Sequence, residues 1–196
     1  MNSKTKAILI GTILGDAFLQ KTGEKNARIR LEHSEKQKEY LLWLGKNLKP
    51  FFQGKPTKMT RFNPIFKKTY SYVRWQSSAS PEIGKWRRIF YANGKKCMPE
   101  ILPEIFKDNL SLAVWFMDDG YYYQRDKIAY IYLSKLNQAE WDILLLTLKN
   151  NFSLEGVIKI KKRGENVLIF SVHETAKLMQ LISPHIIPSM SYKISA

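Results

Sequence analysis

The chain has 196 residues, of which 44% are hydrophobic and 25% charged, so it is long enough to bury a substantial core as one or two domains. Lysine and arginine total 32 against 17 aspartates and glutamates, and the net charge of +15 favours a polyanionic partner, either nucleic acid or an anionic membrane surface. The apolar runs fall short of the roughly 18–20 residues that span a bilayer. The single cysteine, Cys97, excludes internal disulfides and cysteine-rich zinc sites and is typical of a reducing compartment. We therefore expect the polyanionic partner to be nucleic acid.

The first half of the chain opens with an apolar, helix-like run at residues 9–17 (LIGTILGDA), which carries no charge before Asp16. Residues 27–34 (ARIRLEHS) alternate apolar and polar side chains, the period of a half-buried strand. The other elements expected here are a strand at 17–21, a helix at 35–49, strands at 55–63 and 69–77, and a helix that starts at Pro81. In the helix at 35–49, helical spacing places four apolar side chains on one inward face: Tyr40, Leu41, Leu44 and Leu48.

The second half repeats this order. Its first run, residues 112–120 (LAVWFMDDG), has Asp119 at the same eighth position that Asp16 holds in the first run. The pattern then predicts a helix at 110–119, strands near Tyr121 and at 128–134, a helix at 138–151, strands at 156–163 and 166–172, and a helix at 173–181. We therefore predict a gene-fused duplication with halves 1–104 and 105–196, which form one compact pseudodimer of antiparallel sheets covered by helices on one side.

The uncovered faces of these sheets are predicted to carry basic, amide and tyrosine side chains. On the strand 69–77, Tyr72, Arg74 and Gln76 share one face; on the strand 156–163, Ile158 and Ile160 are expected to point inward and the basic residues outward. A merely solvated face is the alternative for any one strand, but strands in both halves agree. Such side chains hydrogen-bond base edges and phosphates in nucleic acids. The predicted DNA-binding residues are Arg28, Arg30, Arg61, Tyr72, Arg74, Gln76, Tyr130, Tyr132, Lys159, Lys161 and Arg163.

The paired carboxylates need a separate explanation, because the C-terminal end of a helix already carries partial negative charge, which disfavours a carboxylate there. A single aspartate there is best explained as a cap or a surface carboxylate. Asp16 and Asp119 in register indicate instead two carboxylates gathered to hold a divalent cation, most simply Mg²⁺.

Two acidic-ended apolar runs within a repeated helix-strand-strand-helix-strand-strand-helix order resemble the LAGLIDADG homing endonucleases in their monomeric, two-motif form. The resemblance covers nearly the whole chain. It implies an α+β fold with a duplicated α-β-β-α-β-β-α order, pseudo-twofold symmetry, two antiparallel saddle-shaped sheets and two central motif helices. Gly11 and Gly15 are the small residues that would let these helices approach each other, and Asp118, which only the second run has, is expected to interact with the first helix or the metal site.

The resemblance also implies the catalytic residues. Asp16 and Asp119 match the positions of the metal-binding carboxylates, Lys193 matches a lysine near the metal, and Lys96 is its counterpart in the first half, with Lys95 as the second choice. Gln76 and Glu32 are further candidates that would support the site.

The function implied is site-specific cleavage of double-stranded DNA by an intron- or intein-encoded monomer, with Mg²⁺ as cofactor and short 3′ overhangs at a long asymmetric site. The alternative is an RNA maturase that binds its host intron RNA, or a non-cleaving DNA-binding protein of the same fold. A membrane partner is not expected. We expect an intracellular protein, either in a prokaryotic cytoplasm or encoded by an organelle genome.

Overall fold

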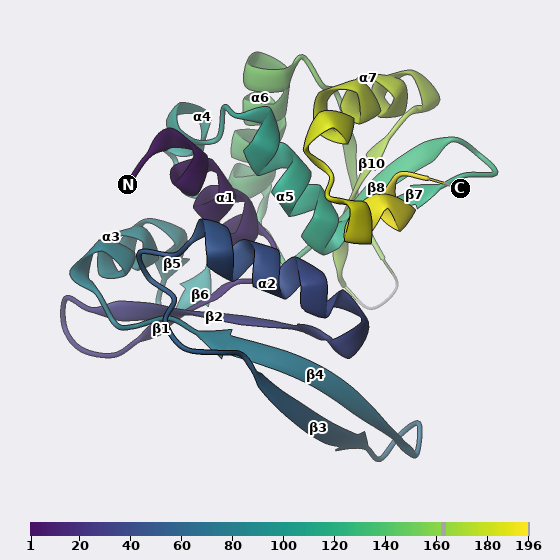
Figure 1. Cartoon of the computed structure of the whole chain (residues 1–196). Helices are drawn as coiled ribbons and strands as arrows, with labels where there is room; N and C mark the ends of the chain where they lie inside the picture. The colour runs from purple at the N-terminus through teal and green to yellow at the C-terminus, as the bar shows by residue number, and fades with distance from the viewer. Residues whose placement is uncertain (162–163, 196) are drawn as a thin grey trace. The chain divides into compact units, whose positions relative to one another are not determined.

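The computed structural model describes residues 1–161 and 164–195 of the chain. They fall into two compact units, one made of Met1–Gly15 with Phe90–Ala196 and the other of Asp16–Ile89. Figure 1 labels the helices and strands of both. The predicted halves, 1–104 and 105–196, follow the internal repeat, whereas these units follow packing; the duplication boundary stays a prediction.

The unit Asp16–Ile89 is built on a four-stranded antiparallel sheet in the order β1-β2-β4-β3. Its strands are β1 (Phe18–Lys21), β2 (Ala27–Ser34), β3 (Thr57–Asn63) and β4 (Lys68–Gln76). After β2 the chain makes a 3-10 turn, η1 (Glu35–Gln37), and enters α2 (Lys38–Asn47), which packs on β2 and β4; α3 (Pro81–Phe90) follows β4. The sheet therefore has one face covered by a helix and one face open.

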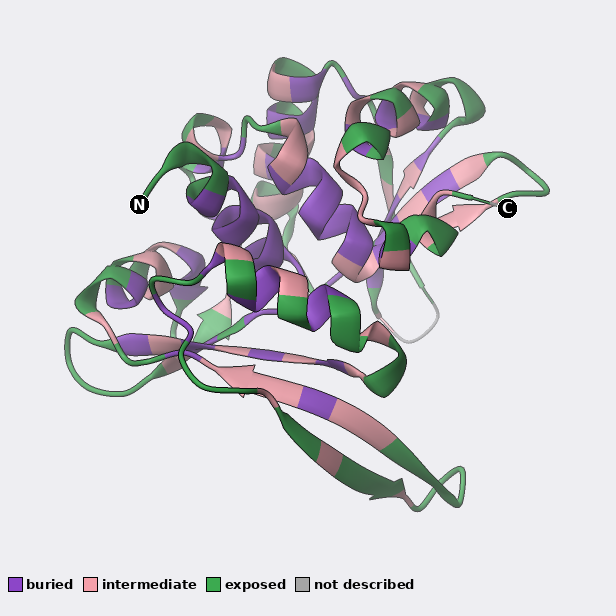
Figure 2. Ribbon diagram, viewed as in Figure 1, coloured by how far each residue is buried: buried purple, intermediate pink, exposed green. Residues whose placement is uncertain are grey.

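The alternation in β2 is the reason for this two-faced sheet. Burial alternates residue by residue along the strand, and Ile29 and Leu31 are fully buried. From α2, Tyr40, Leu41 and Leu44 are buried against them, as Figure 2 shows for the inner side of the helix. The predicted strand at 27–34 and the predicted inward residues of the next helix are confirmed.

The other unit contains the second four-stranded antiparallel sheet, in the order β7-β8-β10-β9, which repeats the strand order of the first. Its strands are β7 (Gly120–Tyr123), β8 (Ile128–Leu133), β9 (Val157–Ile160) and β10 (Asn166–Phe170). The helices are α1 (Ser3–Leu14), α4 (Leu102–Ile105), α5 (Asn109–Asp119), α6 (Gln138–Phe152) and α7 (Val172–Ile182), with 3-10 turns η2 (Ser183–His185) and η3 (Pro188–Lys193) and a small hairpin of β5 (Tyr91–Ala92) and β6 (Lys95–Lys96). Helices α5 and α7 pack on the sheet. The predicted α+β fold with a repeated element order is confirmed.

Helices α1 and α5 pack against each other and are buried over most of their lengths (Figure 2). A Cβ added to Gly11 would lie 2.8 Å from Val114 Cβ and closer still to the Ser111 carbonyl oxygen, and one added to Gly15 would lie 2.8 Å from Asp118 Cγ. The two glycines thus permit the close approach of the helices, as the sequence predicted.

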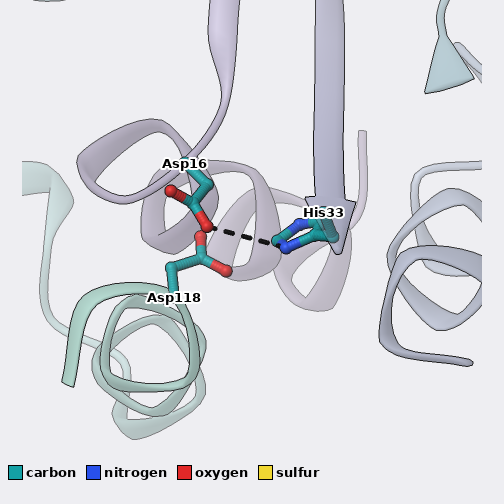
Figure 3. Close-up of side chains that lie close together, drawn as sticks. All are labelled: Asp16, His33 and Asp118. Atoms are coloured by element: carbon teal, nitrogen blue, oxygen red, sulfur yellow. Dashed lines mark ion pairs between the residues drawn. The ribbon is translucent and has the colours of Figure 1, made fainter. Parts of the chain in front are cut away.

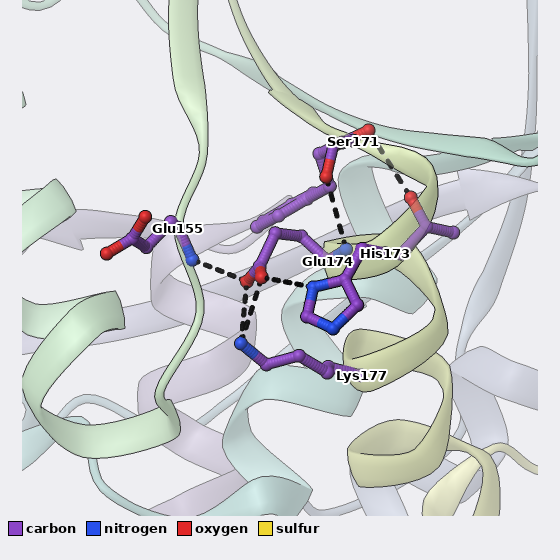
Figure 4. Close-up of polar contacts among 7 residues, drawn as sticks. Glu155, Ser171, His173, Glu174 and Lys177 are labelled. Carbon is purple, nitrogen blue, oxygen red and sulfur yellow. Dashed lines mark hydrogen bonds and ion pairs between the residues drawn. The ribbon is translucent and has the colours of Figure 1, made fainter.

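A polar cluster fixes the start of α7 against the segment before β9 (Figure 4). The Ser171 side chain accepts a hydrogen bond from the Glu174 backbone N–H, while the Glu174 carboxylate accepts from the Glu155 N–H at 2.8 Å and from Lys177 Nζ at 2.9 Å. Burial raises the pKa of Glu174, but these hydrogen bonds and that with His173 outweigh it and hold the pKa below its ordinary value of 4.5. This carboxylate therefore stabilises the folded unit only while it is ionised.

Some expected boundaries and orientations are wrong in detail. Ile160 lies on the helix-facing side by its register with Asn166 but is 64% exposed, because β9 is an edge strand. Val172 belongs to α7, not to the preceding strand. Helix α1 ends at Leu14, so Asp16 lies two residues beyond it, whereas Asp119 is the last residue of α5. Arg163 lies outside the described residues.

Candidate active site and nucleic-acid interface

The unit that contains both motif helices has a cleft of about 580 Å³ where these helices end. Gly15, at the end of α1, and Asp119, at the end of α5, line it. Lys96, Tyr132 and Glu165 are also among the lining residues. Asp16, the residue that follows Gly15 in the chain, belongs to the other unit.

Lys96 and Lys193 hold equivalent places at the ends of the two motif helices. Lys96 Nζ donates to the carbonyl oxygen of Gly15 at 2.6 Å, which is the residue before Asp16. Lys193 Nζ donates to the carbonyl oxygens of Asp118 at 3.2 Å and Gly120 at 2.8 Å, which flank Asp119. An ammonium group at a helix C-terminus satisfies carbonyls that have no partner within the helix and offsets their partial negative charge. Each predicted lysine therefore binds a carbonyl of a residue adjacent in sequence to its predicted aspartate, and in the first half that lysine is Lys96.

Asp118 belongs to the contact between the two motif helices. The hydroxyl of Thr12 in α1 donates to Asp118 Oδ2 at 3.3 Å, and the Asp118 side chain lies where Gly15 has no Cβ. The first of the two expected roles of Asp118, an interaction with the first helix, is the one that these contacts support.

The Asp16 carboxylate has a partner in its own unit that the sequence analysis missed. His33 Nδ1 lies 3.6 Å from Asp16 Oδ2 (Figure 3), and the ring of Tyr40 packs edge-on to the imidazole at a centroid distance of 5.1 Å. His33 is 3% exposed, whereas the Asp16 side chain is 43% exposed. The signal was present in β2, where the alternation places His33 on the same buried face as Ile29 and Leu31. The contact itself forms because β1 and β2 pair antiparallel, so the chain after β1 reverses and brings His33 back beside Asp16.

The open face of the first sheet carries all six of the predicted DNA-binding residues of the first half. Antiparallel register pairs Arg30 with Gln76 and Glu32 with Arg74, so these side chains share a face. Arg28 Nε donates to Gln20 Oε1 at 3.0 Å, and the Arg30 guanidinium lies 4.7 Å from the centre of the Phe18 ring. The predicted common face of Arg28, Arg30, Arg61, Tyr72, Arg74 and Gln76 follows from this register.

Glu32 lies among these arginines. One carboxylate oxygen lies 2.7 Å from Arg61 Nη2, and the other lies 2.7 Å from Arg74 Nη2 and accepts a hydrogen bond from Arg74 Nε. The Arg61 guanidinium also lies 5.3 Å from the centre of the Tyr72 ring. Two charge-assisted contacts and a ring contact restrict both guanidinium groups before any ligand binds. These contacts assign Glu32 to the open sheet face.

The open face of the second sheet has a different composition. Tyr121, Tyr123, Tyr130 and Tyr132 line a shallow hollow of about 450 Å³ together with lysines and aliphatic residues of β9 and β10. Lys161 Nζ lies 4.1 Å from the centre of the Tyr132 ring. Burial, and then the negative charge of Asp126, raise the pKa of Tyr130, so its hydroxyl stays protonated at neutral pH. Tyr130, Tyr132, Lys159 and Lys161 are thus brought together as predicted.

A model of the LAGLIDADG DNA endonuclease family matches residues 6–178, a range that includes both acidic-ended runs and both four-stranded sheets. The chain belongs to the LAGLIDADG DNA endonuclease family. The structure of the homing endonuclease I-WcaI bound to its DNA recognition sequence matches with a TM-score of 0.89 and 26% identity, over 99% of this chain and 87% of that one. The fold predicted from the two motifs is therefore the fold of this family.

Curated relatives of the chain carry different descriptions. Probable intron-encoded endonuclease 1 of Wickerhamomyces canadensis is 29% identical over 95% of this chain and 81% of its own length. Cytochrome b mRNA maturase bI2 of Debaryomyces hansenii is 28% identical, over 95% and 72%. Protein RecA of Mycolicibacterium fallax is 26% identical over 95% of this chain but only 45% of its own, so the LAGLIDADG chain spans less than half the length of that relative.

Among the described residues, no helix has both the length and the apolar character needed to cross a membrane.

Proposed function

We propose that this chain is a site-specific endonuclease that hydrolyses both strands of a DNA duplex with the help of divalent cations held by Asp16 and Asp119. The observation that carries the proposal is the matched arrangement at the two motif ends, where Lys96 and Lys193 each bind a carbonyl beside one of these aspartates. The similarity to a homing endonuclease whose structure was determined with its recognition sequence supports DNA as the substrate. We further propose that the protein acts as a monomer and leaves short 3′ overhangs.

Mg²⁺ fits the residues at the end of α5. The Asp119 carboxylate supplies the hard oxygen ligand that Mg²⁺ prefers, and the adjoining cleft has room for the several waters that this ion retains. When bound, the ion would neutralise charge at the scissile phosphate.

The lysines have a separate task in this scheme. Because backbone carbonyls hold Lys96 and Lys193, their ammonium groups are fixed at the ends of the two motif helices. A cation fixed there attracts the phosphate and stabilises the negative charge that develops on it during hydrolysis. Lys96→Met and Lys193→Met should therefore lower the rate of the chemical step more than the affinity for DNA.

Cleavage of a plasmid that carries the intact insertion sequence of the host element tests the proposal. Asp16→Asn and Asp119→Asn should each lower the cleavage rate by about 10³-fold or more, while duplex affinity measured in Ca²⁺ stays close to that of the unmodified protein. Asp142→Asn is the matched control, because Asp142 contacts Gln138 on the surface of α6 and should not matter. If both motif variants cut as fast as the control, the assignment of the metal ligands is wrong.

The maturase similarity favours a second candidate function, the promotion of splicing of a host intron RNA. In a splicing assay with that RNA, the Asp16→Asn and Asp119→Asn variants should retain activity if RNA is bound on another surface. Loss of splicing in both variants, with folding intact, would contradict a separate RNA site. We also propose, as the intron-encoded relative suggests, an organelle-encoded or prokaryotic origin.

A further inference from the structure

The open faces of the two sheets differ in the chemistry that they offer to a base pair. The strands of the first sheet contain four arginines, all on its open face, and Glu32 restricts two of them, Arg61 and Arg74. The strands of the second sheet contain no arginine within the residues that the structure describes. Their open face instead carries the rings of Tyr121, Tyr123, Tyr130 and Tyr132 and the aliphatic side chain of Ile169.

The first face is suited to guanine. A guanidinium group has five N–H donors in a planar fork, and Glu32 contacts one nitrogen of Arg61 and two of Arg74, so each group keeps further donors for a ligand. Arginine reads guanine by donating two hydrogen bonds to O6 and N7 in the major groove. Because Glu32 already restricts these side chains, less rotamer entropy is lost when they bind.

The second face is suited to thymine. Thymine is the base that presents a methyl group in the major groove, and apolar side chains recognise it by contact. Tyr121 and Tyr132 are 48% and 43% exposed, and Val157 at the edge is 59% exposed, so apolar surface is available there. The tyrosine hydroxyls both donate and accept hydrogen bonds, so by themselves they discriminate weakly between bases. Lys159 and Lys161, which flank the hollow, supply charge for phosphates.

We propose that the DNA target is chemically divided: the half-site bound by the first sheet is recognised through guanine edges, and the half-site bound by the second sheet is recognised through thymine methyl groups. This inference rests on the proposed function, because it requires a duplex target that both sheets contact. It goes further in naming the base groups that each half-site must present.

Base analogues test the division without altering the protein. Duplexes with a randomised central segment are first selected for binding to the whole chain, and the selected duplex is then resynthesised with single replacements. Uracil in place of thymine removes only the methyl group, and 7-deazaguanine in place of guanine removes only the N7 acceptor. We expect uracil to lower affinity by about fourfold per contacted methyl in one half-site, and 7-deazaguanine to lower it by about tenfold in the other.

Two variants assign each half-site to its sheet. Arg74→Met removes all the N–H donors of the side chain, so it should abolish sensitivity to 7-deazaguanine at one position of the guanine half-site. Tyr132→Ala should abolish sensitivity to uracil at a position of the other half-site. If a duplex is selected and cleaved but the effects of uracil and 7-deazaguanine fall equally on both half-sites, this inference is wrong while the proposed function stands. If no duplex is enriched, the inference and the proposed function both fail.

Discussion

The close packing of the motif helices makes a quantitative prediction for Gly11→Ala. The added methyl group would meet the Ser111 carbonyl oxygen, which is backbone and cannot rotate away, and Val114 Cβ at 2.8 Å. Alanine gains about 1 kcal/mol over glycine in a helix interior. Overpacking costs about 1–3 kcal/mol, and the backbone clash places this site at the upper end of that range. We therefore expect a net loss of about 2 kcal/mol in the free energy of unfolding.

For a chain of this length, that loss corresponds to a fall of about 4–8 °C in Tm, which a thermal scan and a urea titration can both detect. Gly23→Ala is the control, since an added Cβ there meets nothing within 4 Å and should leave Tm nearly unchanged. An unchanged or higher Tm for Gly11→Ala would refute the close approach of α1 and α5, because helix propensity alone predicts a gain.

Substitutions at three further residues test other contacts. Thr12→Val removes the hydroxyl that donates to Asp118 and should cost about 1–2 kcal/mol in urea unfolding, whereas Thr12→Ser should cost less; equal losses would contradict the hydrogen bond. Since the pKa of Glu174 is lowered in the folded protein, its stabilising contribution is present above 4.5 and is lost as pH falls through the lowered pKa. The stability of Glu174→Gln should therefore fall less between neutral pH and about pH 3 than that of the unmodified protein, and parallel urea midpoints would count against this. Glu32→Gln removes one negative charge and frees Arg61 and Arg74, so affinity for random duplexes should rise while the preference for the target falls; a preserved affinity ratio at fixed salt would show that Glu32 does not position these arginines.

The sequence pattern was sufficient to predict the structure wherever the burial of side chains follows the period of a helix or a strand. The strand 27–34 and the inward residues of α2 were predicted because alternation and helical spacing report directly which side chains leave water. The exposure of Ile160 was not predicted, because alternation gives the side of the sheet on which a residue lies but cannot say that β9 is an edge strand. The aspartates and lysines of the proposed site were predicted from the repeated motif and the family resemblance, and the structure adds the carbonyl groups that Lys96 and Lys193 bind.

By itself, then, the sequence determined the duplicated element order, an aspartate at the same position of both apolar runs and the net positive charge, since each depends on residue type and short-range spacing. Only the tertiary structure decided that His33 lies against Asp16, that Asp118 fills the space beside Gly15, and that Glu32 holds two arginines on one sheet face. These contacts join residues far apart in the chain. Their distances are set by strand register and helix approach, which no local pattern encodes.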